Sequence, residues 1–284
     1  TVNRALQLSN LGRYEEAARI FAEARSLGLR DGIQARLLRN FEAIDALNRG
    51  DLAAVAPILA RPVPDPSPLP EVVDGAVEID PRLAASLNSG LATGLTDATN
   101  QETRLTRIER AAIIDAQAEQ IAATALRLQD RPDEAFAKLT RARDSLLAVK
   151  QGRVLSTARL EAQILSEMAL VDEDRQRYGE AERRLREAVA LTELRYPGSA
   201  SVESSKARLA AFLTRRDRRG EAMGIYRGIV DEVAGKKAAL VGLENLIRPY
   251  FAMLVEDAAT RPEAVSDLFL AAQLVERPGA AQTL

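Results

Sequence analysis

The stretch ALQLSNLGRYEEAARIFAEA, residues 5–24, decides the fold. Asn10 and Gly12 give a turn signal. Counted from Tyr14, a small residue follows at the third position, a large one at the seventh and a small one at the tenth. This spacing places all of them on one face of a helix. The stretch therefore predicts a tight turn followed by an amphipathic helix, whose apolar face contains Ala17, Phe21 and Ala24.

The same template recurs along the chain. It is complete at Pro132 and Tyr178, partial at Arg219 and Arg261, and degenerate at Leu52. The residue twelve positions before the first small residue of each copy is always Ala. Because two helices joined by a tight turn approach closely only where small side chains lie at their crossing, we interpret each pair as the crossing point of a helical hairpin. The predicted crossing residues are Ala5 and Ala17, Ala43 and Val55, Ala123 and Ala135, Ala169 and Ala181, Ala210 and Ala222, and Ala252 and Ala264.

The composition indicates an all-α fold. Ala accounts for 50 of the 284 residues and aromatic residues for only 4%. Ala is the strongest helix former and lets helix axes come close together. The alternation of β-branched residues that strands need is hardly visible.

The spacing resembles that of the tetratricopeptide repeat. Residues 5–24 match that motif closely, and QRYGEAERRLREAVAL, residues 176–191, is a second good match. The signature Trp of the motif is absent. The first small residues of successive copies, which we call the anchors, lie 38, 80, 46, 41 and 42 residues apart, further than the standard repeat length of ~34. The resemblance implies a right-handed α-α superhelix, a solenoid with repeats of about 38–46 residues.

The spacing of 80 residues is about twice the other spacings, so the pattern is interrupted within it. This interruption divides the chain into three predicted parts: hairpins over 1–61, a connector with a degenerate repeat over 62–103, and hairpins over 104–284. PVPDPSPLP, residues 62–70, has Pro at alternate positions, which is typical of an extended segment. It is either a plain surface loop or a strap that folds back over the repeats. RLAASLNSGLATGL, residues 82–95, predicts a helix, and a long helix is expected from about Arg104 to Leu128.

The C-terminal segment suggests a second resemblance. PYFAMLVEDAATRPEAVSDLFLAAQLVERPGAAQTL, residues 249–284, is similar to the segment that joins the repeats to the caspase-like protease domain of bacterial CHAT proteins. This resemblance implies that the chain is the regulatory or sensing region of a larger cysteine protease, with an intramolecular protease domain as one partner. The alternatives are a free-standing adaptor and, for the segment itself, a final hairpin that caps the solenoid.

The residue content excludes several kinds of active site. The chain has no Cys and no His, so neither a Cys–His nor a Ser–His–Asp mechanism can be built from it alone. It has no Gly-rich phosphate loop and no spacing of oxygen ligands typical of calcium. We predict no catalytic residue, no cofactor and no metal site, and therefore no enzyme within this chain.

The charge pattern bears on partners and location. With 39 basic and 41 acidic residues, the chain gives no reason to expect nucleic acid, and no apolar run is long enough for a membrane helix. We interpret RRDRR, residues 215–219, and VDEDRQR, residues 171–177, as solvated turns. The expected location is the cytoplasm, with an export signal before Thr1 left open.

The expected partner is a protein or peptide in the concave groove that first helices line in tetratricopeptide superhelices. The corresponding positions are polar and rich in amides, and they lack the Lys and Asn set that captures acidic chaperone tails. The groove candidates are Asn40, Ile44, Gln117, Gln120, Thr124, Arg127, Gln163, Ser166 and Ala207.

Overall fold

The computed structural model describes residues 2–66, 105–236, 240 and 242–275. Over these residues the chain forms twelve α-helices and one short 3₁₀ helix, with no strand, which confirms the all-α prediction. The described residues form two compact units, Thr1–Arg175 and Gln176–Leu284. The predicted helix over 82–95 and most of the proline-rich connector lie outside the described residues.

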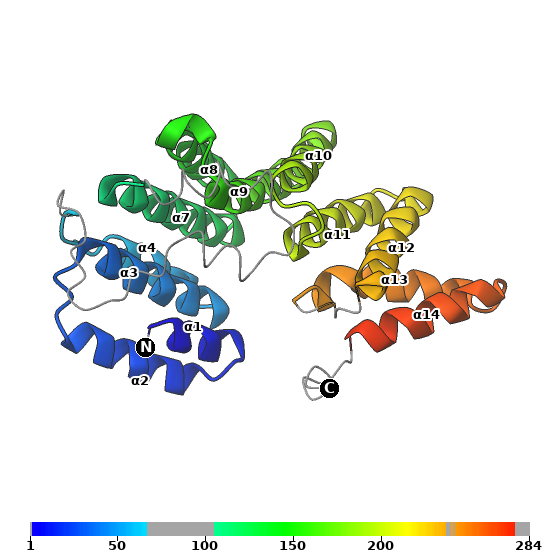
Figure 1. Cartoon of the computed structure of the whole chain (residues 1–284), viewed down its shortest axis with the longest axis horizontal. Coiled ribbons are helices and arrows are strands. Elements are labelled where there is room, and N and C mark those ends of the chain that lie inside the picture. The colour runs from blue at the N-terminus through cyan, green and yellow to red at the C-terminus, as the bar shows by residue number, and fades with distance from the viewer. Residues whose placement is uncertain (1, 67–104, 237–239, 241, 276–284) are drawn as a thin grey trace, which may run out of the picture. The chain divides into compact units, whose positions relative to one another are not determined.

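The first unit consists of consecutive helical hairpins (Figure 1). Each hairpin stacks on the next in chain order, because α3 contacts both α1 and α7, and α7 contacts α9. The long helix expected to begin near Arg104 begins at Arg107, after a capping box formed by Thr106 and Glu109. The elements are α1 (Val2–Asn10), α2 (Tyr14–Ser26), α3 (Gly32–Asn48), α4 (Leu52–Leu59), α7 (Arg107–Leu128), α8 (Pro132–Ala148), η1 (Val149–Gly152) and α9 (Leu155–Asp174).

The second unit repeats this arrangement with α11–α12 and α13–α14, and both helices of the first pair contact the second pair. Pro249 lies inside α13. Tyr226 and Tyr250 stack with their ring centroids 5.4 Å apart, and the Tyr226 hydroxyl donates to the Leu246 carbonyl oxygen at 2.9 Å. The elements are α10 (Tyr178–Arg195), α11 (Ala200–Arg215), α12 (Arg219–Gly235), α13 (Glu244–Asp257) and α14 (Pro262–Val275).

The described division differs from the three parts expected from the sequence. The boundary predicted at 104 lies inside the first unit, because α7 packs against α3 and α4. Ala43 and Val55 share a buried cluster with Ile121 and Ala125 of α7. The hairpins on either side of the connector therefore belong to one core.

A left-handed residue sets the register of each tight turn. The residue five positions before the second-helix anchor has a positive φ in five successive turns, at Gly12, Gly50, Asp130, Gln176 and Asp217. Such a residue lets the next amide bond back to a carbonyl of the preceding helix. Arg13 N–H donates to Leu8 at 2.9 Å, and Arg218 N–H donates to Leu213 at 3.0 Å. Because the turns share this geometry, the anchors on either side keep a constant spacing.

Five of the six predicted crossings have Ala on both helices, which gives ten alanines. Nine of these alanines are buried, and Ala252 is not. Ala5 and Ala17 share one buried cluster, and Ala123 and Ala135 share another. Ala252 is exposed, and its neighbours Met253 and Leu254 are buried instead. The last turn has Ala259 where the others have a left-handed residue, and its φ is not positive. Because this turn follows a different path, counting twelve positions back from Ala264 does not give a buried residue, and the prediction of Ala252 as a crossing residue is wrong.

Candidate functional site

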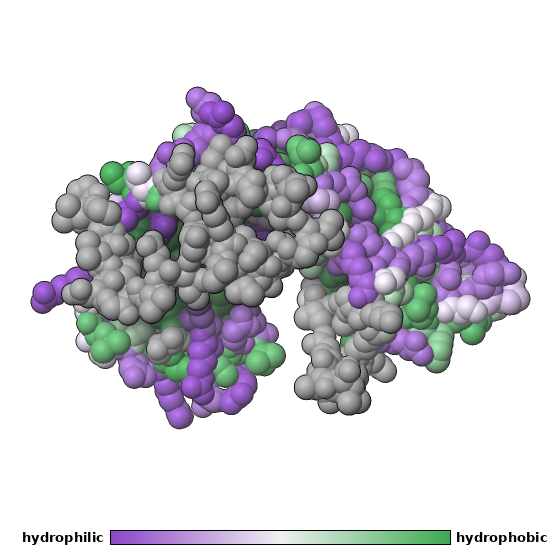
Figure 2. Space-filling model, in the orientation of Figure 1, coloured by the Kyte–Doolittle hydropathy of each residue, from purple (hydrophilic) through white to green (hydrophobic). Residues whose placement is uncertain are grey.

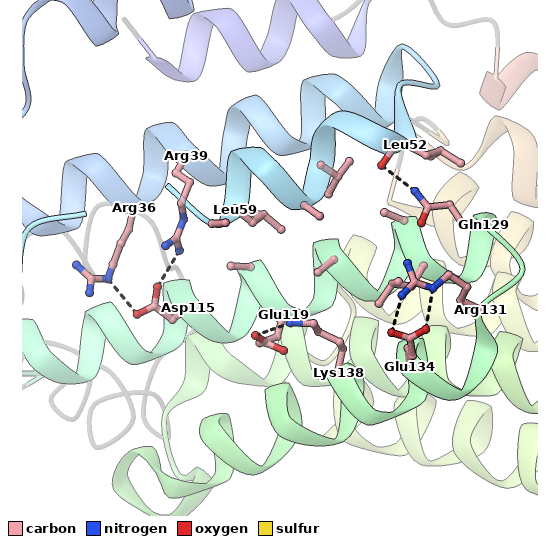
Figure 3. Close-up of a pocket in the computed structure, with 17 residues that line it drawn as sticks. Arg36, Arg39, Leu52, Leu59, Asp115, Glu119, Gln129, Arg131, Glu134 and Lys138 are labelled. Atoms are coloured by element: carbon pink, nitrogen blue, oxygen red, sulfur yellow. Dashed lines mark hydrogen bonds and ion pairs between the residues drawn. The ribbon is translucent and has the colours of Figure 1, made fainter. Parts of the chain in front are cut away.

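A groove lies between α4 and α8, above one face of α7, in the first unit (Figure 3). Its volume is about 580 Å³. Its floor contains Ala118, Ala122 and Ala125 of α7, with Val55 and Leu59 of α4 beside them. The α7 residues follow helical spacing, so they form one continuous stripe. Their small side chains leave the space open.

The length of α4 accounts for the position of the groove. This helix has only 8 residues and ends at Leu59, whereas α8 on the other side has 17. The chain then turns away over the start of α3, where the Arg36 guanidinium donates to the Pro64 carbonyl oxygen at 2.7 Å. A short second helix therefore leaves part of the α7 face without a neighbour.

One wall of the groove carries two arginines that share one carboxylate. Asp115 of α7 accepts from Arg36 Nε at 3.0 Å and from Arg39 at 2.8 Å. Both arginine side chains are only 10% exposed. Arg36 also donates to the Gly32 carbonyl oxygen at 3.1 Å. Packing and hydrogen bonds thus hold these guanidinium groups at the edge of the floor.

The opposite wall repeats this arrangement one turn further along α7. Glu119 accepts from Lys138 Nζ at 3.1 Å and from Arg141 at 3.3 Å, both on α8. Asp115 and Glu119 lie four residues apart, so they share a helix face but contact opposite walls. Figure 3 shows the Arg36, Arg39 and Lys138 contacts on either side of the alanine floor.

The far end of the groove is closed by neutral pairs. Arg131 donates to both carboxylate oxygens of Glu134, at 2.7 and 2.6 Å, and this hydrogen bond lowers the pKa of Glu134 and raises the pKa of Arg131. The Gln129 amide donates to the Leu52 carbonyl oxygen at 2.9 Å. The groove can hold an apolar ligand along its floor and interact with charges along its walls.

The structure places the predicted groove candidates elsewhere, and three of them are inaccessible. Asn40 is fully buried and donates to the Ile114 carbonyl oxygen at 2.7 Å. Ser166 is buried and donates to the Ala162 carbonyl oxygen at 2.8 Å. Ala207 is also buried. In the first unit α3 packs against α7, so Asn40 faces the protein interior and not an open groove.

The remaining candidates are partly occupied by contacts within the chain. Gln117 accepts from Asn40 at 3.3 Å, Gln120 donates to the Thr124 hydroxyl at 3.3 Å, and Arg127 pairs with Glu167 at 3.5 Å. Ile44 packs against the cluster around Ala43. Gln163 is exposed. None of the predicted candidates lines the groove between α4 and α8.

The basic run at 215–219 is largely neutralised within the second unit. Arg218 pairs with Glu182 and Glu221, and Arg219 pairs with Glu256 at 2.6 Å and Asp257 at 2.8 Å. Arg216 lies over the Tyr178 ring, 4.0 Å from its centroid. This run therefore does not present the unpaired cationic face that nucleic-acid binding needs.

The surface view agrees with this distribution of charge. The visible described surface in Figure 2 is mostly hydrophilic, and its hydrophobic residues occur in small separate groups. Within the described ranges, no group of three or more His, Cys, Asp and Glu residues could hold a metal ion. None of the described helices has both the length and the apolar character to cross a bilayer.

Comparison with known proteins does not identify a family. No protein-family model matches the chain, and no curated protein matches it either.

Proposed function

We propose that this chain is a protein-interaction scaffold of tetratricopeptide-like hairpins, and that it binds a helical segment of another protein in the groove between α4 and α8. The observation that carries the proposal is the alanine stripe on α7. The stripe covers about 10 Å of helix between Ala118 and Ala125. It lies within a groove of about 580 Å³ that α7 lines from Asp115 to Gln129. An amphipathic helix laid into an apolar groove is a common mode of peptide recognition.

The residue content supports binding over catalysis. The chain has no Cys and no His, so a cysteine-protease active site is not present in it. The charged groups that line the groove are engaged in ion pairs with one another. Ion pairs at the rim of an apolar groove provide specificity for a bound chain.

Filling the groove tests the proposal. Ala122→Trp places an indole on the floor, and Ala22→Trp places the same side chain on an exposed position of α2 in the same unit. A phage-displayed peptide library is selected on the wild-type chain, and selected peptides are then measured on both variants. We expect Ala122→Trp to weaken binding at least tenfold and Ala22→Trp to leave it unchanged. Peptides that bind both variants equally would contradict the groove assignment.

A second candidate function is that of regulatory region for a CHAT-type protease domain, and an apolar face on α14 favours it. On α12, Met223 is buried and Arg227 pairs with Asp267 of α14 at 2.7 Å. This face of α12, the second helix of its hairpin, therefore packs against α14, the second helix of the next hairpin. The corresponding positions on α14 are Val265 and Phe269, which are 52% and 66% exposed.

An apolar face at such a position suits a further packed element. The gene sequence that follows Leu284 tests this candidate. A stretch of about 250 residues with alternating strands and helices, and with one Cys and one His at strand ends, would support it. A stop codon directly after Leu284 would contradict it and favour the free-standing adaptor.

A further inference from the structure

The two walls of the groove carry an excess of positive charge next to the apolar floor. Asp115 is shared by Arg36 and Arg39, and Glu119 is shared by Lys138 and Arg141. Each cluster has two cations and one carboxylate, so each has a net charge of +1. The pair of Arg131 and Glu134 at the end of the groove adds none.

The arginine cluster can accept a second carboxylate. A guanidinium group has five N–H donors, and Arg39 uses its donors on Asn40 and one oxygen of Asp115. Because Arg36 and Arg39 are mostly buried, water screens their charge less than it screens a surface charge. The backbone carbonyl groups that accept from Arg36 hold its position without cancelling its charge.

The lysine cluster offers the same charge with more freedom. Lys138 and Arg141 are 31% and 58% exposed, so their side chains can reorient toward a bound ligand. This cluster lies on α8, and the arginine cluster lies on α3. A ligand on the alanine floor therefore meets the excess charge of the arginine cluster directly. On the α8 side the excess charge is that of Arg141, which pairs with Glu119 and lies just outside the lining of the groove.

We infer that the partner segment is an acidic amphipathic helix, with Asp or Glu residues on both borders of its apolar stripe. This inference rests on the proposed function. Because Asp115 and Glu119 are one turn apart, the acidic residues on the two borders lie within about one turn of each other. The apolar stripe packs on Ala118 and Ala122, the partly exposed alanines of the floor. A helix with basic borders is repelled by both clusters.

Designed peptides test the inference. Three fluorescent helical peptides of about 14 residues share one apolar stripe and carry Glu, Gln or Lys on both borders. Fluorescence anisotropy measures their affinities for the wild-type chain at low and high salt. We expect the Glu peptide to bind at least tenfold more tightly than the Gln peptide, the Lys peptide to bind most weakly, and salt to reduce the difference.

A charge reversal at the exposed cluster provides the matched variant. Lys138→Glu with Arg141→Glu leaves the buried arginines in place, and we expect it to weaken the Glu peptide about tenfold while it strengthens the Lys peptide. Arg183→Glu on α10, 56% exposed, is the control and changes neither affinity. Thermal unfolding followed by circular dichroism verifies that each variant is folded.

The possible outcomes separate the inference from the proposed function. Equal affinity of the Glu and Gln peptides, with binding lost in Ala122→Trp, would overturn the acidic partner and keep the groove. Preference for the Lys peptide would overturn it as well. If Ala122→Trp binds the Glu peptide as tightly as the wild type, or if no peptide binds, both the inference and the groove assignment fail.

Discussion

Replacing Ala135 by Leu tests the packing of the hairpins. Ala135 is fully buried in a cluster with Ala123 and Leu139, where α7 and α8 pack together. Leu adds three carbon atoms that this crossing has no space for, and overpacking of this kind costs about 1–3 kcal/mol of unfolding free energy. Ala137, two positions along the same helix, is exposed. Ala137→Leu makes the same chemical change with no crowding and changes stability by less than about 0.5 kcal/mol.

Urea unfolding followed by far-UV circular dichroism measures both variants. For a unit of this size, each kcal/mol lowers the melting temperature by about 2–4 °C. We therefore expect the urea midpoint and the melting temperature to fall for Ala135→Leu and to stay constant for Ala137→Leu, with equal m values. Equal losses in the two variants, or no loss in Ala135→Leu, would refute the reasoning that small residues set the helix approach.

Three further predictions concern the turns, the ion pairs and the core. Gly12 has a φ of +75°, so Gly12→Ala lowers the unfolding free energy by about 1 kcal/mol. Gly224 lies in the interior of α12 with open space where a Cβ would be, so Gly224→Ala raises the unfolding free energy by about 0.5–1 kcal/mol; thermal melts distinguish the two. Hydrogen bonds from Arg261 and Arg219 hold the pKa of Asp257 below its ordinary value of 3.8. The stability from this carboxylate is present above pH 3.8 and is lost as the pH falls through the lowered pKa; an NMR titration that gives a value above 3.8 would contradict it. Leu139→Ala removes a buried side chain from the α7–α8 core and costs about 2–5 kcal/mol, measured by urea unfolding, and a loss below about 1 kcal/mol would count against this core.

The local pattern was enough to predict most turns and helix starts in advance. The template begins at Tyr14, Pro132, Tyr178 and Arg219, which are the first residues of α2, α8, α10 and α12. The two agree because a turn of constant geometry fixes the distance in sequence from the turn to the apolar residues of the second helix. The template failed at Ala252, since the preceding copies depend on a left-handed residue that Ala259 does not supply. The difference between Asp217 and Ala259 is visible in the sequence and gives a signal for the change of register.

The candidate site could not be predicted in the same way. The analogy with first helices predicts Asn40 and Ser166 in an open groove, but both side chains are buried. The groove that is present depends on where α4 ends relative to α8, which is a tertiary property. The available signals were Pro57 in a short helix and the alanine stripe on α7, which has the same spacing as the buried stripes of the core.

Site-specific crosslinking tests the central claim most directly. Because the chain has no native Cys, Ala118→Cys on the groove floor and Ala22→Cys on the exposed face of α2 each provide a single attachment point for a benzophenone probe. With the Glu-bordered peptide, we expect a photo-crosslink from the probe at position 118 and none from the probe at position 22. Crosslinks of equal yield at both positions, or none from position 118 with a peptide that binds the chain, would contradict it.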